Sequence, residues 1–164
     1  MAAVPAFAEF YAATYPRLLV QVHAFIGDQA EAQDLVQEAY TRAFTRWSTV
    51  SSFDDPEGWV RRVAWNLAIS RWRRARRLFK WRHDLVADDV DGPNGDVLDL
   101  TRALAKLSPA YRQVVILHYL ADQSVREIAA FVGVAEGTVK ARLHRARAAL
   151  NELLGVPDKR VNND

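Results

Sequence analysis

The stretch SVREIAAFVGVAEGTVKARLHRARAAL, residues 124–150, predicts two helices joined by a tight turn. Ser124 and Glu127 have the spacing of a capping box, which begins a short first helix. Gly133 suits the left-handed backbone of a turn that ends this helix. Small or branched apolar residues stand where the two helices would cross or leave a gap: Ala129, Val134 and Val139. This combination is typical of a DNA-binding helix-turn-helix.

The second helix of the pair, expected from residue 136 to about 153, has one apolar face and one basic face. Its apolar residues recur at i, i+4, i+7 and i+11: Val139, Leu143, Ala146 and Leu150. Opposite them lie the residues placed to enter a major groove: Gly137, Lys140, Ala141, His144 and Arg145. Arg142 and Arg147 flank that face and suit phosphates, and Thr138 can add a phosphate contact near the amino end. The alternative is a plain helical hairpin, against which the joint spacing and the basic face argue.

Charge is distributed unevenly along the 164 residues, although the formal net charge is only +2. Residues 61–83 contain nine Lys and Arg and no acid, whereas residues 84–99 contain six Asp and no base. A basic block of this kind is the usual footprint of a polyanion. The alternative is that these cations form a solvated helix face.

The amino-terminal part predicts three helices. The first covers residues 6–26, and Asp28 with Glu31 can cap the second. The buried stripe expected on the second helix is Val36, Ala39, Tyr40, Ala43, Phe44 and Trp47, and its expected outer residues are Asp34, Gln37, Glu38, Thr41 and Arg42. Residues 48–55 are expected to form a polar loop. Asp55 and Pro56 then begin a third helix, which enters the basic block and should bury Val60, Val63, Ala64 and Leu67.

This third helix has a second face that combines aromatic, amide and cationic side chains: Trp59, Arg62, Asn66, Ser70, Arg73 and Arg77. At about 100° per residue they fall within about 80° of one another, opposite the apolar stripe. Aromatic rings that stack on bases among cations are what single-stranded DNA binding requires. The alternative is that the tryptophans pack in the core. For Trp65 and Trp72 we favour the core, whereas Trp59 is balanced between the two interpretations.

Together these helices predict an all-α fold of two small helical domains. A helical bundle is expected over residues 5–80 and a helix-turn-helix domain over 99–155, where helices over 97–106 and 109–119 precede the pair. A polar acidic linker over 81–98, containing DDVDGPNGD, joins them.

Composition narrows the function classes. Half of the residues are hydrophobic, which allows a packed core, and the absence of cysteine excludes disulfides and thiolate sites. No apolar run approaches the roughly 20 residues of a membrane span, and no secretory leader is present, so we expect a cytoplasmic protein without membrane insertion. The four histidines are scattered and no phosphate-binding glycine loop or nucleophile elbow occurs. We therefore expect no enzyme, no metal site and no cofactor.

Three segments resemble the extracytoplasmic-function (ECF, group IV) sigma factors of the sigma-70 family. AQDLVQEAYTRAFTRW (32–47) is similar to region 2.2, and EGWVRRVAWNLAISRWRRARR (57–77) to regions 2.3 and 2.4. LSPAYRQVVILHYLADQSVREIAAFVGVAEGTVKARLHRARAAL (107–150) is similar to region 4. Three segments in family order and spacing are specific. The resemblance implies an alternative sigma factor that binds core RNA polymerase, recognises the −35 and −10 promoter elements and promotes transcription initiation.

The resemblance also implies a role for each set of outer residues. The set that would meet the β′ clamp helices of core polymerase is Asp34, Leu35, Gln37 and Glu38. The set that would bind −10 DNA is Trp59, Arg62, Asn66, Ser70, Arg71, Arg73, Arg74 and Arg77, with residues 48–55 as a base-capturing loop. The set that would bind −35 DNA is Thr138, Lys140, Ala141, Arg142, His144, Arg145 and Arg147. The further partners that it implies are the polymerase β flap and an anti-sigma factor.

Two residues depart from the family pattern. Gln33 stands where the family usually has Glu, which removes one charge near the polymerase-facing side, and Ser70 stands where Asp is frequent. We interpret Ser70, which an actinobacterial subgroup shares, as a change of promoter preference. The alternative function is a stand-alone helix-turn-helix transcription regulator. It explains residues 124–150 but gives no role to the DLVQE motif, residues 34–38, or to the basic aromatic helix.

Overall fold

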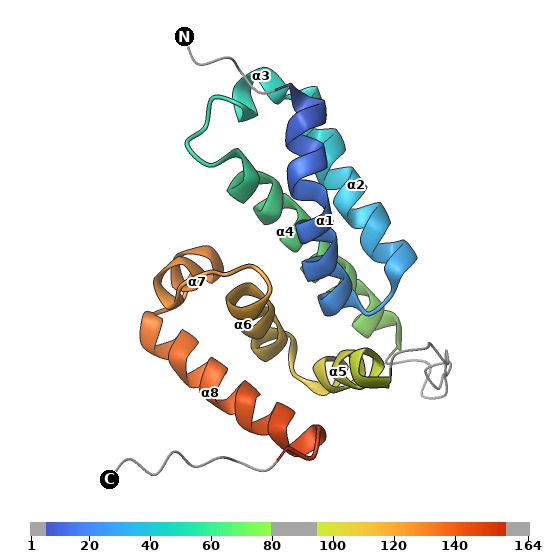
Figure 1. Ribbon diagram of the computed structural model, residues 1–164, viewed down its shortest axis with the longest axis vertical. Coiled ribbons are helices and arrows are strands. Elements are labelled where there is room, and N and C mark those ends of the chain that lie inside the picture. Colours follow the sequence, from blue (N-terminus) through green and yellow to red (C-terminus); the bar gives the residue numbers. More distant parts are fainter. Residues whose placement is uncertain (1–5, 80–94, 157–164) are drawn as a thin grey trace. The chain divides into compact units, whose positions relative to one another are not determined.

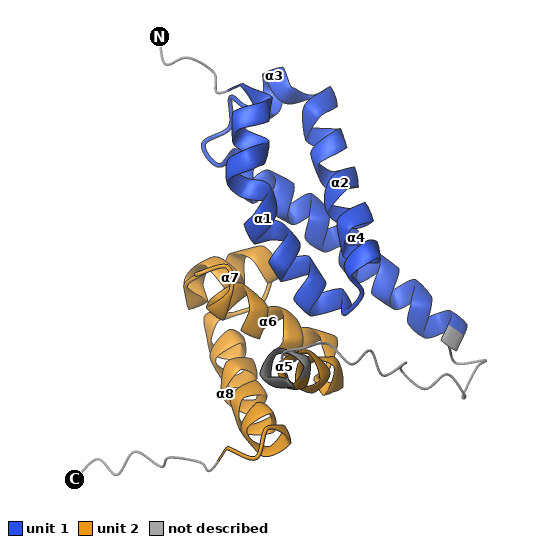
Figure 2. Cartoon of the chain, turned by 45° about the vertical axis from the view of Figure 1, so that its right-hand side comes forward, with its two compact units in different colours: residues 1–89 blue, residues 90–164 orange. Residues whose placement is uncertain are grey.

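The structure of the chain is a computed structural model that describes residues 6–79 and 95–156. Every regular element in those two ranges is a helix (Figure 1). The chain divides into two compact units, Met1–Asp89 and Val90–Asp164 (Figure 2). The predicted all-α class is therefore confirmed. Most of the predicted linker lies outside the described residues, and the helix expected from residue 97 already begins at Gly95.

The first unit contains α1 (Phe7–Ile26), α2 (Gln29–Thr45), α3 (Trp47–Val50) and α4 (Pro56–Phe79). Helices α1 and α2 pack along each other and both pack on α4 (Figure 1). The turn between α1 and α2 follows from local chemistry: Gly27 adopts a φ of 83°, and Asp28 Oδ1 accepts a hydrogen bond of 2.8 Å from the Glu31 amide. A left-handed φ is what glycine supplies without strain, and the Asp cap satisfies an amide at the helix start.

The core of the first unit lies between α1, α2 and α4 and is made of the fully buried side chains Val22, Phe25, Val36, Ala39, Val60, Ala64, Trp65 and Ala68. The predicted stripe on α2 is wrong at its carboxyl end. Phe44 is 63% exposed, and Trp47 is half-buried. Phe44 is about 80° around the helix from Val36, so it leaves the buried face. On α4, Val63 and Leu67 are likewise only half-buried.

Residues 48–55 were predicted to form a polar loop, but they are not entirely a loop. The single turn of helix α3 occupies the first part of this segment, and its residue Val50 is 1% exposed. The buried side chain of Val50 anchors this turn to the rest of the first unit. Only the remainder, 51–55, is a turn without helix.

The second unit contains α5 (Gly95–Lys106), α6 (Pro109–Tyr119), α7 (Val125–Val132) and α8 (Glu136–Leu153). Helix α6 packs on α8 and α7, and α5 on α8. The core is formed by Val114, Ile116, Leu117, Ile128, Val139 and Leu143. Buried Arg112 on α6 donates hydrogen bonds of 3.0 Å to the carbonyls of Ala105 and Leu107, and desolvation by burial lowers its pKa. Arg112 thereby fixes the end of α5 against α6.

Candidate nucleic-acid and protein interfaces

Helix α4 carries the candidate single-strand DNA face of the first unit. Its start is fixed by Asp55, whose Oδ1 accepts a hydrogen bond of 2.8 Å from the Gly58 amide, as the sequence predicts. Val60, Ala64, Trp65 and Ala68 are all 0% exposed and set the rotation of the helix. The opposite side of α4 is therefore turned outward.

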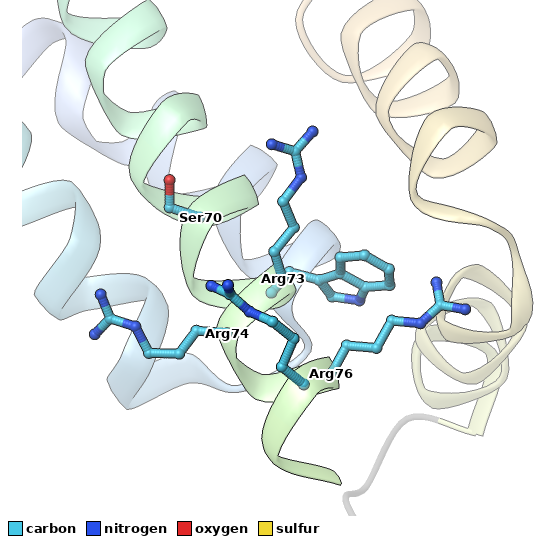
Figure 3. Close-up of a pocket in the computed structure, with 6 residues that line it drawn as sticks. Ser70, Arg73, Arg74 and Arg76 are labelled. Atoms are coloured by element: carbon cyan, nitrogen blue, oxygen red, sulfur yellow. The ribbon is translucent and has the colours of Figure 1, made fainter. Parts of the chain in front are cut away.

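The structure brings most of the predicted −10 residues together on that outward side. Arg62, Asn66, Ser70, Arg73 and Arg77 are all exposed. Figure 3 shows Ser70, Arg73, Arg74 and Arg76 along the carboxyl-terminal half of α4, with their side chains directed away from the helix axis. The guanidinium groups give this half of the helix a dense positive charge, which attracts phosphates.

Trp59 is half-buried at the amino-terminal end of this face. Its ring lies 6.5 Å from that of Phe53, centroid to centroid, at an angle of 46°. Phe53 comes from the turn before α4 and is 41% exposed. Phe53 was not among the residues predicted from the sequence, although an aromatic residue within the polar stretch SSFDD is a signal for a role in binding. Two exposed or partly exposed rings side by side form a surface on which a base can stack.

Arg71 differs from the other predicted DNA contacts. Its Nε lies 2.7 Å from Oε1 of Glu31, at the start of α2. At about 100° per residue, Arg71 is turned well away from Asn66 and Arg73, so it leaves the outward face. Arg71 therefore has an intramolecular partner and lies apart from the outward face, and its contact with DNA stays a prediction.

The other two tryptophans of α4, Trp65 and Trp72, differ in their environments. Trp65 is 0% exposed, its Nε1 donates to Gln21 Oε1 over 3.4 Å, and its ring meets that of Phe25 edge-on at 5.1 Å. The prediction that Trp65 packs in the core is confirmed. Trp72 is only half-buried, with the Arg76 guanidinium 5.2 Å above its ring. Such a cation–π contact stabilises a ring that is not enclosed by the core.

Helix α2 carries the candidate protein-binding face. Asp34, Gln37 and Glu38 are exposed, as predicted. Glu38 is paired with Arg42 over 2.8 Å, one helical turn away. Leu35 requires a correction, because it is 8% exposed and belongs to the core, so its side chain is not available to a partner.

Helices α7 and α8 form the helix-turn-helix (Figure 1). Both bonds of the predicted capping box are present: the Glu127 amide donates to Ser124 Oγ over 3.1 Å, and the Ser124 amide to Glu127 Oε2 over 2.7 Å. Gly133 ends α7 with φ 78° and ψ 36°, in the left-handed region. The predicted turn between the two helices is therefore confirmed.

The predicted −35 residues project from α8, whose rotation is set by Val139, Leu143 and Ala146, each at most 1% exposed. Leu150, the last residue of the predicted stripe, is half-buried. The exposed candidates on α8 are Thr138, Lys140, Ala141, His144, Arg145 and Arg147, and Arg142 is half-buried at the edge. A half-buried arginine beside an exposed basic face is suited to reach a phosphate rather than a base.

Within residues 6–79 and 95–156, no cluster of three or more His, Asp or Glu side chains could hold a metal ion. In the same ranges no helix is both long and apolar enough to cross a membrane.

Family comparisons agree with this division into two units. The model for Sigma-70 region 2 matches residues 10–78, and that for Sigma-70, region 4 matches residues 98–150. The RNA polymerase sigma-E factor of Streptomyces coelicolor is 34% identical over 162 residues, which cover 96% of this chain and 91% of that protein. The ECF RNA polymerase sigma factor SigW of Bacillus subtilis is 32% identical over 152 residues, covering 80% of each chain.

Solved structures are similar as well. The sigma factor RpoE from Bartonella quintana, in complex with the anti-sigma factor NepR, gives a TM-score of 0.78 at 26% identity, covering 92% of this chain and 98% of that one. CnrH in complex with the cytosolic domain of CnrY gives 0.65 at 26% identity, covering 92% and 88%. The chain thus belongs to the sigma-70 family. Within that family it is a member of the extracytoplasmic-function group.

Proposed function

We propose that this chain directs core RNA polymerase to a set of promoters, as an alternative sigma factor of the ECF type. The observation that carries the proposal is the presence of two separate basic faces in one chain: the outward side of α4, rich in aromatic and arginine residues, and the exposed side of α8. The first suits unstacked bases and the second suits duplex DNA. A promoter offers both, at the −10 and −35 elements.

In the proposed complex, α4 holds an unstacked base of the −10 element. Trp59, with Phe53 beside it, supplies the stacking surface, and Asn66 supplies donor and acceptor groups for a base edge. Arg62 would lie beside the captured base, and Ser70 would alter the promoter preference. Arg73, Arg74 and Arg77 would follow the sugar–phosphate backbone. Unstacking a base costs a few kcal/mol. Stacking worth about 1–3 kcal/mol per base offsets that cost, so the binding energy of α4 can favour the open duplex.

The exposed residues of α8 are proposed to read the −35 element in the major groove. Lys140, His144 and Arg145 would contact base edges, with Ala141 allowing close approach. Thr138, Arg142 and Arg147 would hold the phosphates on either side. Phosphate contacts make such binding fall steeply with salt.

The exposed face of α2 is proposed to dock on the β′ clamp helices of core polymerase through Asp34, Gln37 and Glu38. Buried Leu35 would support this face from within. The second unit would meet the polymerase β flap. On this proposal, residues 5–80 bind the polymerase and −10 DNA, residues 99–155 bind −35 DNA, and 81–98 connect them.

The mechanism proposed here is binding without catalysis, and it takes place in the cytoplasm, where polymerase and chromosome meet. An anti-sigma factor is a further proposed partner. The two similar structures support it, since RpoE was solved with an anti-sigma factor and CnrH with the cytosolic domain of CnrY. Such a partner would compete with polymerase for the faces described above.

Transcription in vitro tests the proposal. Core polymerase is incubated with a pool of random promoter sequences, with and without this chain, and the transcripts are sequenced. We expect starts that share −35 and −10 elements only when the chain is present. Binding to duplex DNA without retention of core polymerase or directed initiation would instead support a stand-alone helix-turn-helix regulator.

A further inference from the structure

Gln37, on the exposed face of α2, is held by tyrosines of α1. Its Nε2 donates a hydrogen bond of 2.7 Å to the hydroxyl of Tyr11, which lies 26 residues earlier in the chain. Tyr15 lies beside the same carboxamide. Burial and the neighbouring Tyr11 raise the pKa of Tyr15, and a hydrogen bond with Gln37 opposes that rise. A residue on the outside of one helix is therefore anchored from another helix.

Tyr11 is itself fixed by its aromatic neighbours. Its ring stacks on that of Tyr15 at 4.8 Å and 28°, and meets that of Tyr40 edge-on at 5.0 Å and 75°. Tyr40 is 2% exposed, and its hydroxyl shares a buried hydrogen bond of 2.6 Å with Thr14. Since the ring of Tyr11 has little freedom, its hydroxyl is a fixed acceptor for the Gln37 amide.

This anchoring decides which polar atom Gln37 offers to a partner. A carboxamide has two N–H donors and one carbonyl acceptor. Because the amino group donates to Tyr11, we infer that Oε1 is the atom that the exposed side chain offers to a partner. The neighbouring exposed side chains, Asp34 and Glu38, are carboxylates and so are acceptors too, although Glu38 already accepts a hydrogen bond from Arg42. A surface of acceptors fits a partner that provides cationic donors, above all arginine.

We propose that Tyr11, supported by Tyr15, is a positioning residue that turns the carbonyl of Gln37 toward a cationic side chain of core RNA polymerase. This inference rests on the proposed docking of α2 on the polymerase. It adds to that docking two residues of α1 that do not lie in the DLVQE motif. It also gives the exposed carboxamide a fixed orientation before the partner arrives, which reduces the entropy lost on binding.

Tyr11→Phe tests the inference, because it removes the hydroxyl and keeps the ring packing. We expect its affinity for core polymerase, measured by competition against a labelled sigma factor, to fall roughly two- to tenfold, the effect of one hydrogen bond. Tyr40→Phe is the matched control, since it also loses one hydroxyl, but one bonded to Thr14 instead of Gln37. It should lower the melting temperature and leave the affinity of the folded protein nearly unchanged.

A double-mutant cycle separates positioning from a general structural role. In a Gln37→Ala background, Tyr11→Phe should have no further effect on affinity, because the group that it orients is gone. An equal loss in both backgrounds, or full affinity of Tyr11→Phe alone, would overturn the inference while leaving the sigma function intact. Failure of the unaltered chain to bind core polymerase would overturn both, and that measurement is made first.

Discussion

Arg71 of α4 and Glu31 of α2 form an ion pair, with 2.7 Å between Arg71 Nε and Glu31 Oε1. The two side chains remain 44% and 33% exposed, so the pair contributes at most about 1 kcal/mol to stability. Its effect is geometric, because it ties the arginine-rich half of α4 to the start of α2. Arg71 thus differs from Arg73 and Arg77, which lie on the outward face and are proposed to hold DNA.

The first prediction compares Arg71→Ala with Arg73→Ala. Arg73→Ala should weaken promoter binding by the polymerase complex and reduce the slope of log affinity against log salt by about 0.7–0.9, the value for one phosphate contact. Arg71→Ala should change the slope by less, because Arg71 would have to leave Glu31 to reach a phosphate. Binding measured over a series of salt concentrations checks this. Equal slope changes for the two variants would contradict the assignment.

The second prediction concerns the buried Trp65, which is 0% exposed and donates a hydrogen bond to Gln21. Trp65→Ala should destabilise the first unit by about 3–5 kcal/mol, the cost of a large cavity in a core. Denaturant unfolding followed by circular dichroism measures it. Trp59→Ala is the control. Removal of this half-buried ring should lower the free energy of unfolding much less, but it should weaken open-complex formation, because about 1–3 kcal/mol of base stacking is lost. Similar unfolding midpoints for both variants would count against this distinction.

Helix starts were predictable from sequence because they depend on neighbouring residues. The caps at Asp28, Asp55 and Ser124 all accept an amide hydrogen bond at the expected helix start, from Glu31, Gly58 and Glu127. The left-handed Gly133 follows from the same local chemistry. The outward faces of α4 and α8 then follow from helical periodicity.

Features that depend on how two helices meet were not predictable. The pairing of Arg71 with Glu31 requires the rotation of α4 against α2, which no single helix encodes. The exposure of Phe44 is different, because its position about 80° around α2 from Val36 follows from the helical period alone; its ring lies 5.0 Å from that of Phe7, outside the core. The turn of α3 is too short to show a period, so the polar residues of this segment suggested a loop.

The third prediction concerns alkaline pH. Burial raises the pKa of Tyr40 from 10.0 to about 12, against a hydrogen bond with Thr14 that lowers it. Because the folded state favours the neutral phenol, its contribution to stability is complete below pH 10 and is lost as the pH rises toward 12. Unfolding free energies measured across this window should therefore decline. In Tyr40→Phe the decline should be shallower, and an unchanged pH dependence would argue against this origin.

The last prediction distinguishes contacts with base edges from contacts with phosphates on α8. His144 and Arg147 both lie exposed on a helix whose rotation is fixed by buried Leu143 and Ala146. If His144 contacts a base edge, His144→Ala should cost about 1–3 kcal/mol on the preferred −35 sequence and far less on others, so that preference relaxes. Arg147→Ala should instead weaken binding to all sequences alike and reduce the salt slope by about 1. Transcription from a promoter library randomised at −35 measures both. If His144→Ala weakened binding to all −35 sequences equally, His144 would be a phosphate contact, and Lys140 and Arg145 would be the residues that contact base edges.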